Sequence, residues 1–142
     1  MEKLGIISII GVIGSFISNF FGGWNEAMTT LCIFMLTDYV TGLIVAGIFK
    51  KSTKTNDGGL ESKAGFKGLM RKFAVLLLVL IACRLDMMFD TSFVKDCVII
   101  AFIANETISI TENIGLMGVP IPKVIEKAIT LLNEKGEEKN EF

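Results

Sequence analysis

Residues 97–118, with the sequence CVIIAFIANETISITENIGLMG, decide which fold the chain can adopt. The segment is long enough to cross a membrane as a helix, which takes about 20 apolar residues. It nevertheless contains the polar or acidic side chains Asn105, Glu106, Ser109, Glu112 and Asn113. Acids inside a membrane face a bundle interior or water, because exposing a charge to lipid is costly. We therefore predict a membrane helix with a polar stripe, which is either a structural hydrogen-bond network or a water-contacting face between subunits.

The composition of the whole chain agrees with a membrane protein. Of the 142 residues, 51% are hydrophobic and the mean hydropathy is +0.61, whereas a soluble domain of this size needs a more polar surface. The chain has no histidine, the commonest general base and metal ligand. A hydrolase or a zinc protein is therefore disfavoured, and we expect no enzyme activity, metal or cofactor. The formal net charge of −1 also gives no basic surface of the kind that binds nucleic acid.

Three further segments are candidates for membrane helices. Residues 4–25 carry no charge, and residues 27–49 carry only Asp38. Residues 69–89 form a third span that we expect to be short, because its most apolar part, 73–83, covers only about 16 Å as a helix. If this segment does not cross, the C-terminus lies on the opposite side of the membrane. A cleaved secretory signal is the rival interpretation of the first segment, but its small-residue cleavage site is not evident.

These segments predict an all-α membrane protein, a single domain with about four transmembrane helices. After a hinge at Gly118, Pro120 and Pro122, residues 121–135 repeat apolar side chains at the intervals of an amphipathic helix. This helix is expected to lie on the inner membrane face or to pack on a neighbouring copy. The charged residues 136–142 are expected to form a disordered tail.

The loop between the second and third spans gives the predicted orientation. Its acids are Asp57 and Glu61, and its bases are Lys50, Lys51, Lys54, Lys63, Lys67, Arg71 and Lys72. A loop with such an excess of positive charge stays in the cytoplasm. With four spans, the N-terminus and the C-terminus are then cytoplasmic as well. The same bases could also contact anionic lipids.

The first span has a face of small residues opposite a face of bulky ones. The small face consists of Ser8, Gly11, Gly14, Ser15, Ser18 and Gly22, with Asn19 beside them. Small residues allow two helix backbones to approach closely. We expect this seam to pack inside the monomer, to join subunits or to line a mildly polar pore.

Two acids are expected near the middle of the bilayer. Asp38 lies at the centre of the second span, and Glu106 lies at a similar depth on an antiparallel helix. No basic residue of the spans is expected at that depth, so the two carboxyl groups would have no cation between them. Such a pair suits a proton relay as well as a structural network.

The cysteines Cys32, Cys83 and Cys97 form no closely spaced metal-binding pair. Isolated cysteines among apolar neighbours are typical of buried packing residues. Cys83 and Cys97 are both expected near one membrane face, so the sequence leaves a disulfide between them open.

Three stretches of the chain carry a family resemblance when they are taken in order. Asp38-Tyr-Val-Thr-Gly42 lies within the second span, residues 61–72 (ESKAGFKGLMRK) precede the third, and residues 105–123 (NETISITENIGLMGVPIPK) close the core. This set resembles the phage lysis and toxin-secretion holin family, which includes the clostridial toxin-secretion holins. The most specific part is the run E-x-x-S-x-x-E-N-x-x-x-x-G-x-P-x-P, which begins at Glu106. The matched positions are Asp38, Thr41, Gly42, Ser62, Gly65, Gly68, Arg71, Lys72, Glu106, Ser109, Glu112, Asn113, Gly118, Pro120 and Pro122.

The resemblance implies a small protein of the bacterial cytoplasmic membrane that oligomerises and forms holes. These holes would release a peptidoglycan-degrading endolysin or large toxins without a stable complex with the cargo. The expected partners are thus other copies of the chain and the lipid bilayer. Two other functions stay open on the residues alone. One is a small proton-coupled transporter that uses Asp38 and Glu106, and the other is a non-porous membrane anchor.

Overall fold

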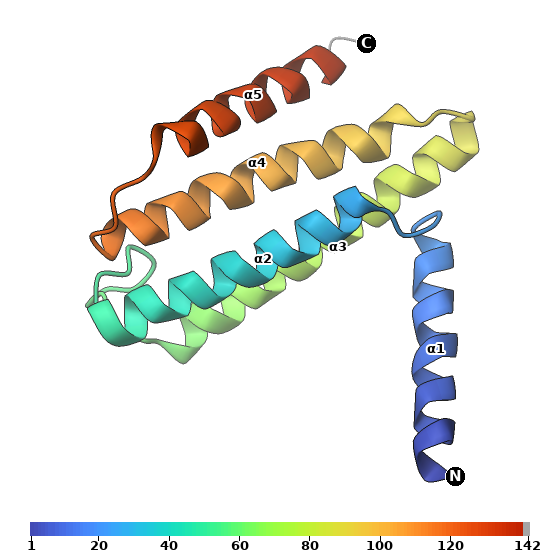
Figure 1. Cartoon of the computed structure of the whole chain (residues 1–142), viewed down its shortest axis with the longest axis horizontal. Coiled ribbons are helices and arrows are strands. Elements are labelled where there is room, and N and C mark those ends of the chain that lie inside the picture. The colour runs from blue at the N-terminus through green and yellow to red at the C-terminus, as the bar shows by residue number, and fades with distance from the viewer. Residues whose placement is uncertain (141–142) are drawn as a thin grey trace.

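The computed structural model describes residues 1–140 and is all-helical, with no strand in that part of the chain (Figure 1). The prediction of an all-α fold is confirmed. The elements are α1 (Glu2–Phe20), α2 (Glu26–Ile44), the π-helical turn η1 (Val45–Phe49), α3 (Ser62–Phe89), α4 (Phe93–Leu116) and α5 (Lys123–Asn140).

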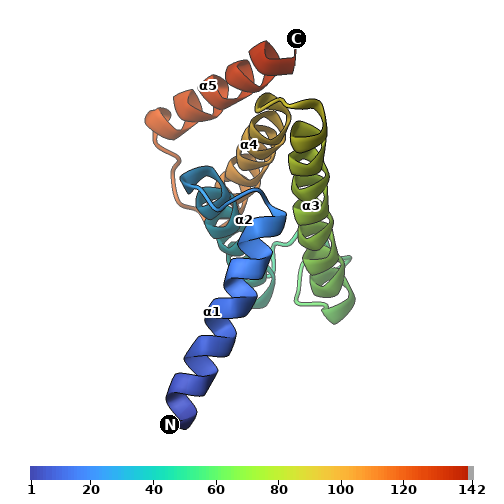
Figure 2. The ribbon, with the colours of Figure 1, turned by 90° about the vertical axis from the view of Figure 1, so that its right-hand side faces the viewer.

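Helices α2, α3 and α4 lie side by side and form a three-helix core (Figures 1 and 2). Its buried cluster takes one face of each helix and consists of Met28, Leu31, Met35, Val79, Ile99 and Ile103. Large apolar side chains also point outward, among them Leu36, Leu78 and Ile81. An apolar surface on both sides of the helices is typical of segments that are covered by lipid or by partner helices.

Two helices within residues 1–140 are long and apolar enough to cross a membrane by themselves, fewer than the four predicted spans. They are α1 and the continuous segment Glu26–Phe49, which joins α2 to η1. Within their lengths, α3 carries Arg71 and Lys72 and α4 carries Glu106 and Glu112. Whether these two helices can cross therefore depends on where their charged side chains point.

Helix α1 projects away from the core at a large angle and has no buried residue (Figures 1 and 2). It ends before Gly22 and Gly23, whose φ angles of 68° and 95° suit glycine. Beside Gly11 and Gly14 of the seam there is no other atom within 4 Å of an added methyl group. Gly22, at the end of the seam, does pack on the core, because a methyl group there would lie 2.9 Å from Cys83 and Met87 of α3. The part of the seam around Gly11 and Gly14 therefore has no packing partner inside the monomer, which was one of the three predicted uses of the seam.

The turn between α1 and α2 is fixed at both ends by polar contacts. Asn25 caps α2 by accepting a hydrogen bond from the backbone N–H of Met28 at 3.0 Å. The Nζ of Lys95, in the first turns of α4, donates to the carbonyl oxygen of Phe21 and, at 3.3 Å, to that of Gly23. The turn is thus held to the core even though α1 itself is not.

Helix α3 is longer than the segment 69–89 predicted for the third span, but it is not among the helices that are apolar enough to cross a membrane by themselves. It has 28 residues and begins seven residues before the predicted start at residue 69, so it extends over about 42 Å. Its first turns pack on α2, where added methyl groups at Gly65 and Gly68 would lie 3.6–3.7 Å from Tyr39. Hydropathy missed these turns because they are basic. As a consequence, Lys67, Arg71 and Lys72 belong to a helix that packs on the core.

The polar linker between η1 and α3 is a folded loop. It begins at Lys50, which has a φ of 52°, and it is closed by a 3.0 Å hydrogen bond from the Ser52 N–H to the Gly58 carbonyl. Gly58 has a φ of 75°, and a methyl group there would lie 2.3 Å from the Lys50 carbonyl oxygen. The loop 50–61 therefore has a defined shape that depends on glycine at this position.

The amphipathic helix α5 packs along α4 of its own chain, an arrangement that differs from both predicted ones (Figure 1). Leu132 contacts the core cluster. The connection turns at Gly118, with a φ of 86°, and at the two prolines of the predicted hinge. The helix begins at Lys123 and continues to Asn140, through most of the segment expected to be a disordered tail. The last two residues of that segment, 141–142, lie outside the described residues.

Candidate functional site

Three charged side chains from three helices meet in the core, and we call them the ion triad. Lys72 Nζ on α3 lies 2.7 Å from Asp38 Oδ2 on α2 and 2.6 Å from Glu106 Oε2 on α4. The side chains of Lys72, Asp38 and Glu106 are only 14%, 8% and 11% exposed. Charge-assisted hydrogen bonds of this length are among the stronger polar contacts in proteins.

The ion triad supports one expectation and corrects two others. Asp38 and Glu106 do approach each other, as predicted. The expectation that their helices are antiparallel is wrong, because α3 leads the chain back and α2 and α4 therefore run in the same direction (Figure 1). The expectation that no cation lies near them is wrong, because Lys72 lies between them. Counted from the start of α3 at Ser62, Lys72 is about 15 Å into the helix. Its side chain turns toward the two carboxylates instead of extending outward to the membrane surface.

Asn113 and Thr41 complete the network around Asp38. Asn113 Nδ2 donates to Asp38 Oδ1 at 3.2 Å and to Thr41 Oγ1 at 3.0 Å, while the Thr41 hydroxyl donates to the Asp38 carbonyl at 3.0 Å. A methyl group on Gly42 would lie 3.8 Å from Asn113 Nδ2, so a larger side chain would press on this amide. The three stretches that carry the family resemblance therefore meet at a single site.

The predicted polar stripe of α4 divides into two columns with different surroundings. Glu106 and Asn113, seven residues apart, are buried and bonded inward. Asn105 and Glu112, also seven apart, are exposed. Ser109 lies between the columns and is half-buried. The structural network and the exposed polar face, which were alternatives for one stripe, thus belong to different columns.

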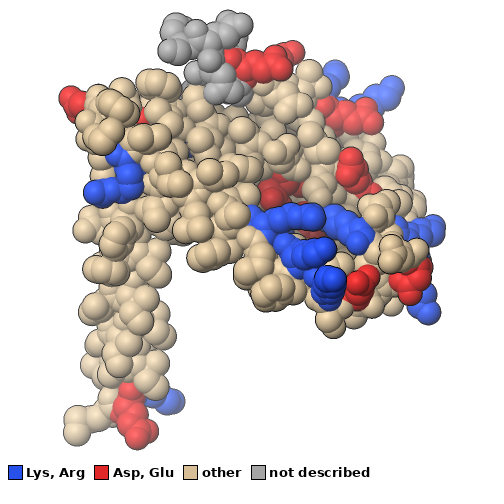
Figure 3. All heavy atoms as spheres, turned by 180° about the vertical axis from the view of Figure 1, so that it is seen from behind, with Lys and Arg blue, Asp and Glu red and all other residues tan. Residues whose placement is uncertain are grey.

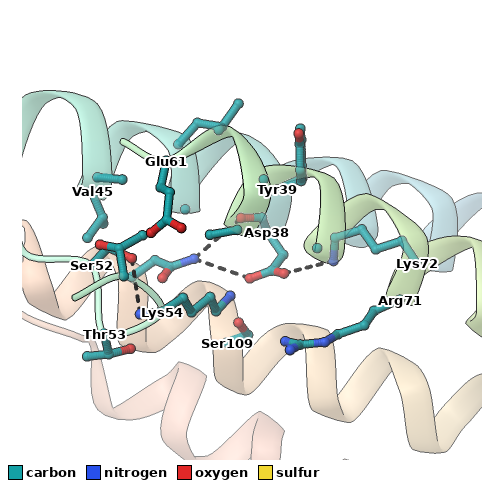
Figure 4. Close-up of a pocket in the computed structure, with 18 of the residues that line it drawn as sticks. Asp38, Tyr39, Val45, Ser52, Thr53, Lys54, Glu61, Arg71, Lys72 and Ser109 are labelled. Carbon is teal, nitrogen blue, oxygen red and sulfur yellow. Dashed lines mark hydrogen bonds and ion pairs between the residues drawn. The ribbon is translucent and has the colours of Figure 1, made fainter. Parts of the chain in front are cut away.

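A cavity of about 350 Å³ lies beside the ion triad, between α2, α3, α4 and the loop 50–61 (Figure 4). Besides the triad, Tyr39, Lys54, Arg71 and Ser109 line it. Figure 3 shows Lys and Arg side chains gathered on one face of the molecule, with carboxylates between them. Of the bases singled out from the sequence, Arg71 and Lys72 line the cavity, whereas Lys50, Lys51 and Lys67 do not.

Some residues of the site had no clear signal in the sequence. Lys54 was one base among seven, and only the fold of the loop 50–61 brings it to the cavity. Tyr39 lies on the α2 surface that faces the glycines of α3, and the sequence gives no such pairing. In contrast, Thr41 and Asn113 were within the motifs, although their hydrogen bond to each other was not predicted.

The remaining predicted positions lie away from the ion triad. The seam of α1 contacts none of it, and the hinge at Gly118, Pro120 and Pro122 follows the end of α4. The cysteines Cys32, Cys83 and Cys97 are free, so no disulfide joins the last two. Across residues 1–140, no group of histidine, cysteine or acidic side chains is arranged to hold a metal ion.

Comparison with known proteins agrees with the convergence of these motifs. The model of the bacteriophage holin family matches residues 15–134. An uncharacterized protein of Listeria innocua is 35% identical over 142 residues, which cover 99% of this chain and 95% of its own. An uncharacterized 14.9 kDa protein of Clostridium perfringens is 35% identical over 135 residues, with 94% and 93% covered. A probable holin of Bacillus phage phi105 is 31% identical over 120 residues, with 84% and 83% covered. No solved structure matches significantly. The chain belongs to the bacteriophage holin family.

Proposed function

We propose that this chain acts as a holin, forming oligomeric holes in the bacterial cytoplasmic membrane through which an endolysin or large toxins leave the cell. Family membership over most of the chain carries this proposal. The apolar outer surface of α1 and of the three-helix core supports it, since these surfaces need lipid or a second copy to cover them.

In this proposal α1, α2 with η1, α3 and α4 cross the membrane, with both termini in the cytoplasm. Of the charges on α3 and α4, Lys72 and Glu106 point inward and neutralise each other, and the exposed Glu112 would face the hole described below. Helices α3 and α4 have 28 and 24 residues, so both exceed the hydrocarbon core of about 30 Å. The basic first turns of α3 can then remain in the headgroup region.

Two helices have to change position for this arrangement. Helix α1 has to turn about Gly22 and Gly23 until it lies beside the core, which its lack of buried residues permits. Helix α5 carries several charges along α4 and cannot stay there inside lipid. It would swing about Gly118 to the inner membrane face, with its apolar side in the interface.

The proposed hole is lined by the exposed column of α4, Asn105 and Glu112. This column makes no inward hydrogen bond, whereas the buried column holds the core together. The ion triad has a net charge of −1 when all its groups are ionised. The membrane potential therefore acts on it, at about 2.3 kcal/mol per charge crossing 100 mV, and depolarisation could favour opening.

The hole can be tested by replacing both column residues with leucine. Because Asn105 and Glu112 are exposed, Asn105→Leu with Glu112→Leu should leave the core intact but remove the polar wall. We expect release of a cytosolic reporter enzyme from expressing bacteria to fall to background at equal membrane levels of protein. Glu126→Leu, an exposed acid on α5, is the matched control and should release normally.

Unchanged release by the double variant would contradict a hole lined by α4. The same assay separates a holin from the rival functions. A proton-coupled exporter would protect cells from a toxic cation and keep the reporter inside. A membrane anchor would change neither the resistance to the cation nor the retention of the reporter. The unsubstituted chain should instead arrest growth and release the reporter.

The seam of α1 is the proposed contact between subunits. Two leucines in place of Gly11 and Gly14 would hold neighbouring α1 helices apart, while the open space beside both glycines leaves the monomer undisturbed. Gly11→Leu with Gly14→Leu should therefore abolish the oligomers seen after chemical cross-linking in membranes. Ile9→Leu with Ile13→Leu, on the bulky face, is the control and should cross-link like the original chain. Oligomers of unaltered size in the glycine variant would exclude this contact.

A further inference from the structure

The cavity beside the ion triad contains two cations that form no ion pair with the triad. Lys54 comes from the loop 50–61 and Arg71 from α3, and both line the cavity. Figure 4 shows their side chains extending toward Ser109 from opposite sides. Among the described residues, neither side chain has a hydrogen bond or an ion pair with another side chain, unlike Lys72.

Within residues 1–140, no acid of the cavity makes an ion pair with either of these two cations. Asp38 and Glu106 share Lys72, Asp38 also accepts from Asn113 and interacts with Ser109, and Lys54 acts on Asp38 only at longer range. Glu61 is the other acid of the lining, and in Figure 4 it lies on the far wall beside Ser52. Around the mouth, the segment 50–72 has seven bases against two acids. An anion approaching this end of the core therefore meets a positive field.

An unsatisfied hydroxyl group lies in the same lining. The Oγ1 atom of Thr55 is buried and has no hydrogen-bond partner among the residues that the structure describes. Buried polar atoms are rarely left unpaired, so a partner from outside the chain is expected here. The Ser109 hydroxyl lies on α4 in the same lining, where it interacts with Asp38. Two cations without an ion pair and the unpaired Thr55 hydroxyl form a set suited to an anion with several oxygen atoms.

We propose that this cavity binds a phosphate group, carried by an anionic lipid or free in solution. Arg71 would hold two of its oxygens with its planar guanidinium, and Lys54 would add a point charge. A volume of about 350 Å³ leaves room for more than phosphate. The apolar wall of Leu43, Val45 and Leu60 could receive the glycerol and the start of an acyl chain. The site does not depend on whether the chain forms holes.

The test is binding to the purified full-length chain in neutral detergent. Native mass spectrometry would measure retention of phosphatidylglycerol and of phosphatidylcholine, which has a phosphate but no net charge, and phosphorus NMR would measure inorganic phosphate. Lys54→Gln with Arg71→Gln should weaken binding at least about tenfold, the effect of losing one good charged contact. Lys51→Gln with Lys63→Gln has the same charge change at bases outside the cavity and should bind like the unsubstituted chain. Circular dichroism must show equal helix content in all three proteins.

The outcomes are separable. If the unsubstituted chain and the control variant retain phosphatidylglycerol and the cavity variant does not, the site is supported and a lipid is its source of phosphate. If the unsubstituted chain and the control variant bind inorganic phosphate saturably and the cavity variant does not, the site is supported and free phosphate is its ligand. Equal loss in both variants would mean general attraction to positive charge and would overturn the proposal. If none of the three probes binds to the unsubstituted chain, the proposal is overturned as well.

Discussion

Replacing Lys72 with methionine is expected to lower the free energy of unfolding of the three-helix core by about 3–5 kcal/mol. The ammonium group lies within 2.7 Å of two carboxylates whose side chains are 8% and 11% exposed. Methionine keeps most of the volume of the lysine side chain but removes its charge. Two acids would then repel each other inside the core, with no cation in hydrogen-bond contact with them. Thermal unfolding of the purified chain in detergent, followed by circular dichroism, measures the loss.

A second variant shows whether the charge is responsible. Asp38→Asn, Lys72→Met and Glu106→Gln together remove all three charges while keeping similar shapes. Replacing a whole buried ion cluster with neutral side chains is often close to neutral for stability, so this triple variant should recover most of what the single one loses. Lys67→Met, at an exposed base of the same helix, should stay within about 0.5 kcal/mol of the original chain.

Two results would contradict this account of the ion triad. If the single Lys72 variant unfolds at the original temperature, the two carboxylates do not need their cation. If the triple variant is no more stable than the single one, Lys72 contributes through its apolar stem and not through its charge. The second result would make the triad a packing feature of the α3 surface.

The sequence predicted the helices well and their mutual contacts only in part. Long apolar segments gave α1, α2 and α4 to within a few residues, because a membrane-length helix needs an uninterrupted run. The approach of Asp38 and Glu106 followed from their similar depth in the second and fourth spans, although the relative direction of the two helices was predicted wrongly. The position of Lys72 between these two acids was not predicted, because a base at the end of an apolar segment is expected to lie at the membrane interface. Which way it turns depends on how α3 is rotated against its neighbours.

The two columns of α4 show the same limit at a finer scale. Periodicity places Asn105, Glu106, Ser109, Glu112 and Asn113 on neighbouring strips of a helix surface. It does not say which strip faces α2 and α3, because that depends on side chains from other helices. Asn113 faces inward since Asp38 and Thr41 offer it acceptors. The fold of the loop 50–61 was missed for a related reason, because its shape depends on the backbone conformation of single residues.

Asp86 carries the other large expected effect, at the opposite end of the core from the basic loop. Its carboxylate accepts hydrogen bonds from the Thr91 hydroxyl at 2.6 Å and from the backbone N–H groups of Val94 and Lys95 at 3.1 and 2.8 Å. Those two N–H groups belong to the first turn of α4, where no partner inside the helix exists. A carboxylate at the end of α3 thus caps the helix that follows it, and its negative charge suits the positive end of α4.

Asp86→Asn is therefore expected to destabilise the start of α4 by about 2 kcal/mol, because an amide offers one acceptor oxygen where the carboxylate offers two. Amide hydrogen exchange should report it directly: at Val94 and Lys95 the exchange rate should rise more than tenfold. Asp90→Asn is the matched control, with the same chemical change at an exposed residue whose φ of 52° asparagine tolerates. Its exchange rates at the same two residues should not change.

The Asp86 variant should also affect α1, although the two do not touch. Lys95 holds the carbonyls of Phe21 and Gly23 through its side chain, so fraying of the first turn of α4 removes the fixed point of the α1–α2 turn. Exchange at Gly22 and Gly23, whose N–H groups bond to α1 carbonyls, should accelerate together with that at Val94. If Val94 exchanges faster while the glycines do not, Lys95 does not couple the two ends. If neither changes, Asp86 is not the cap that holds α4.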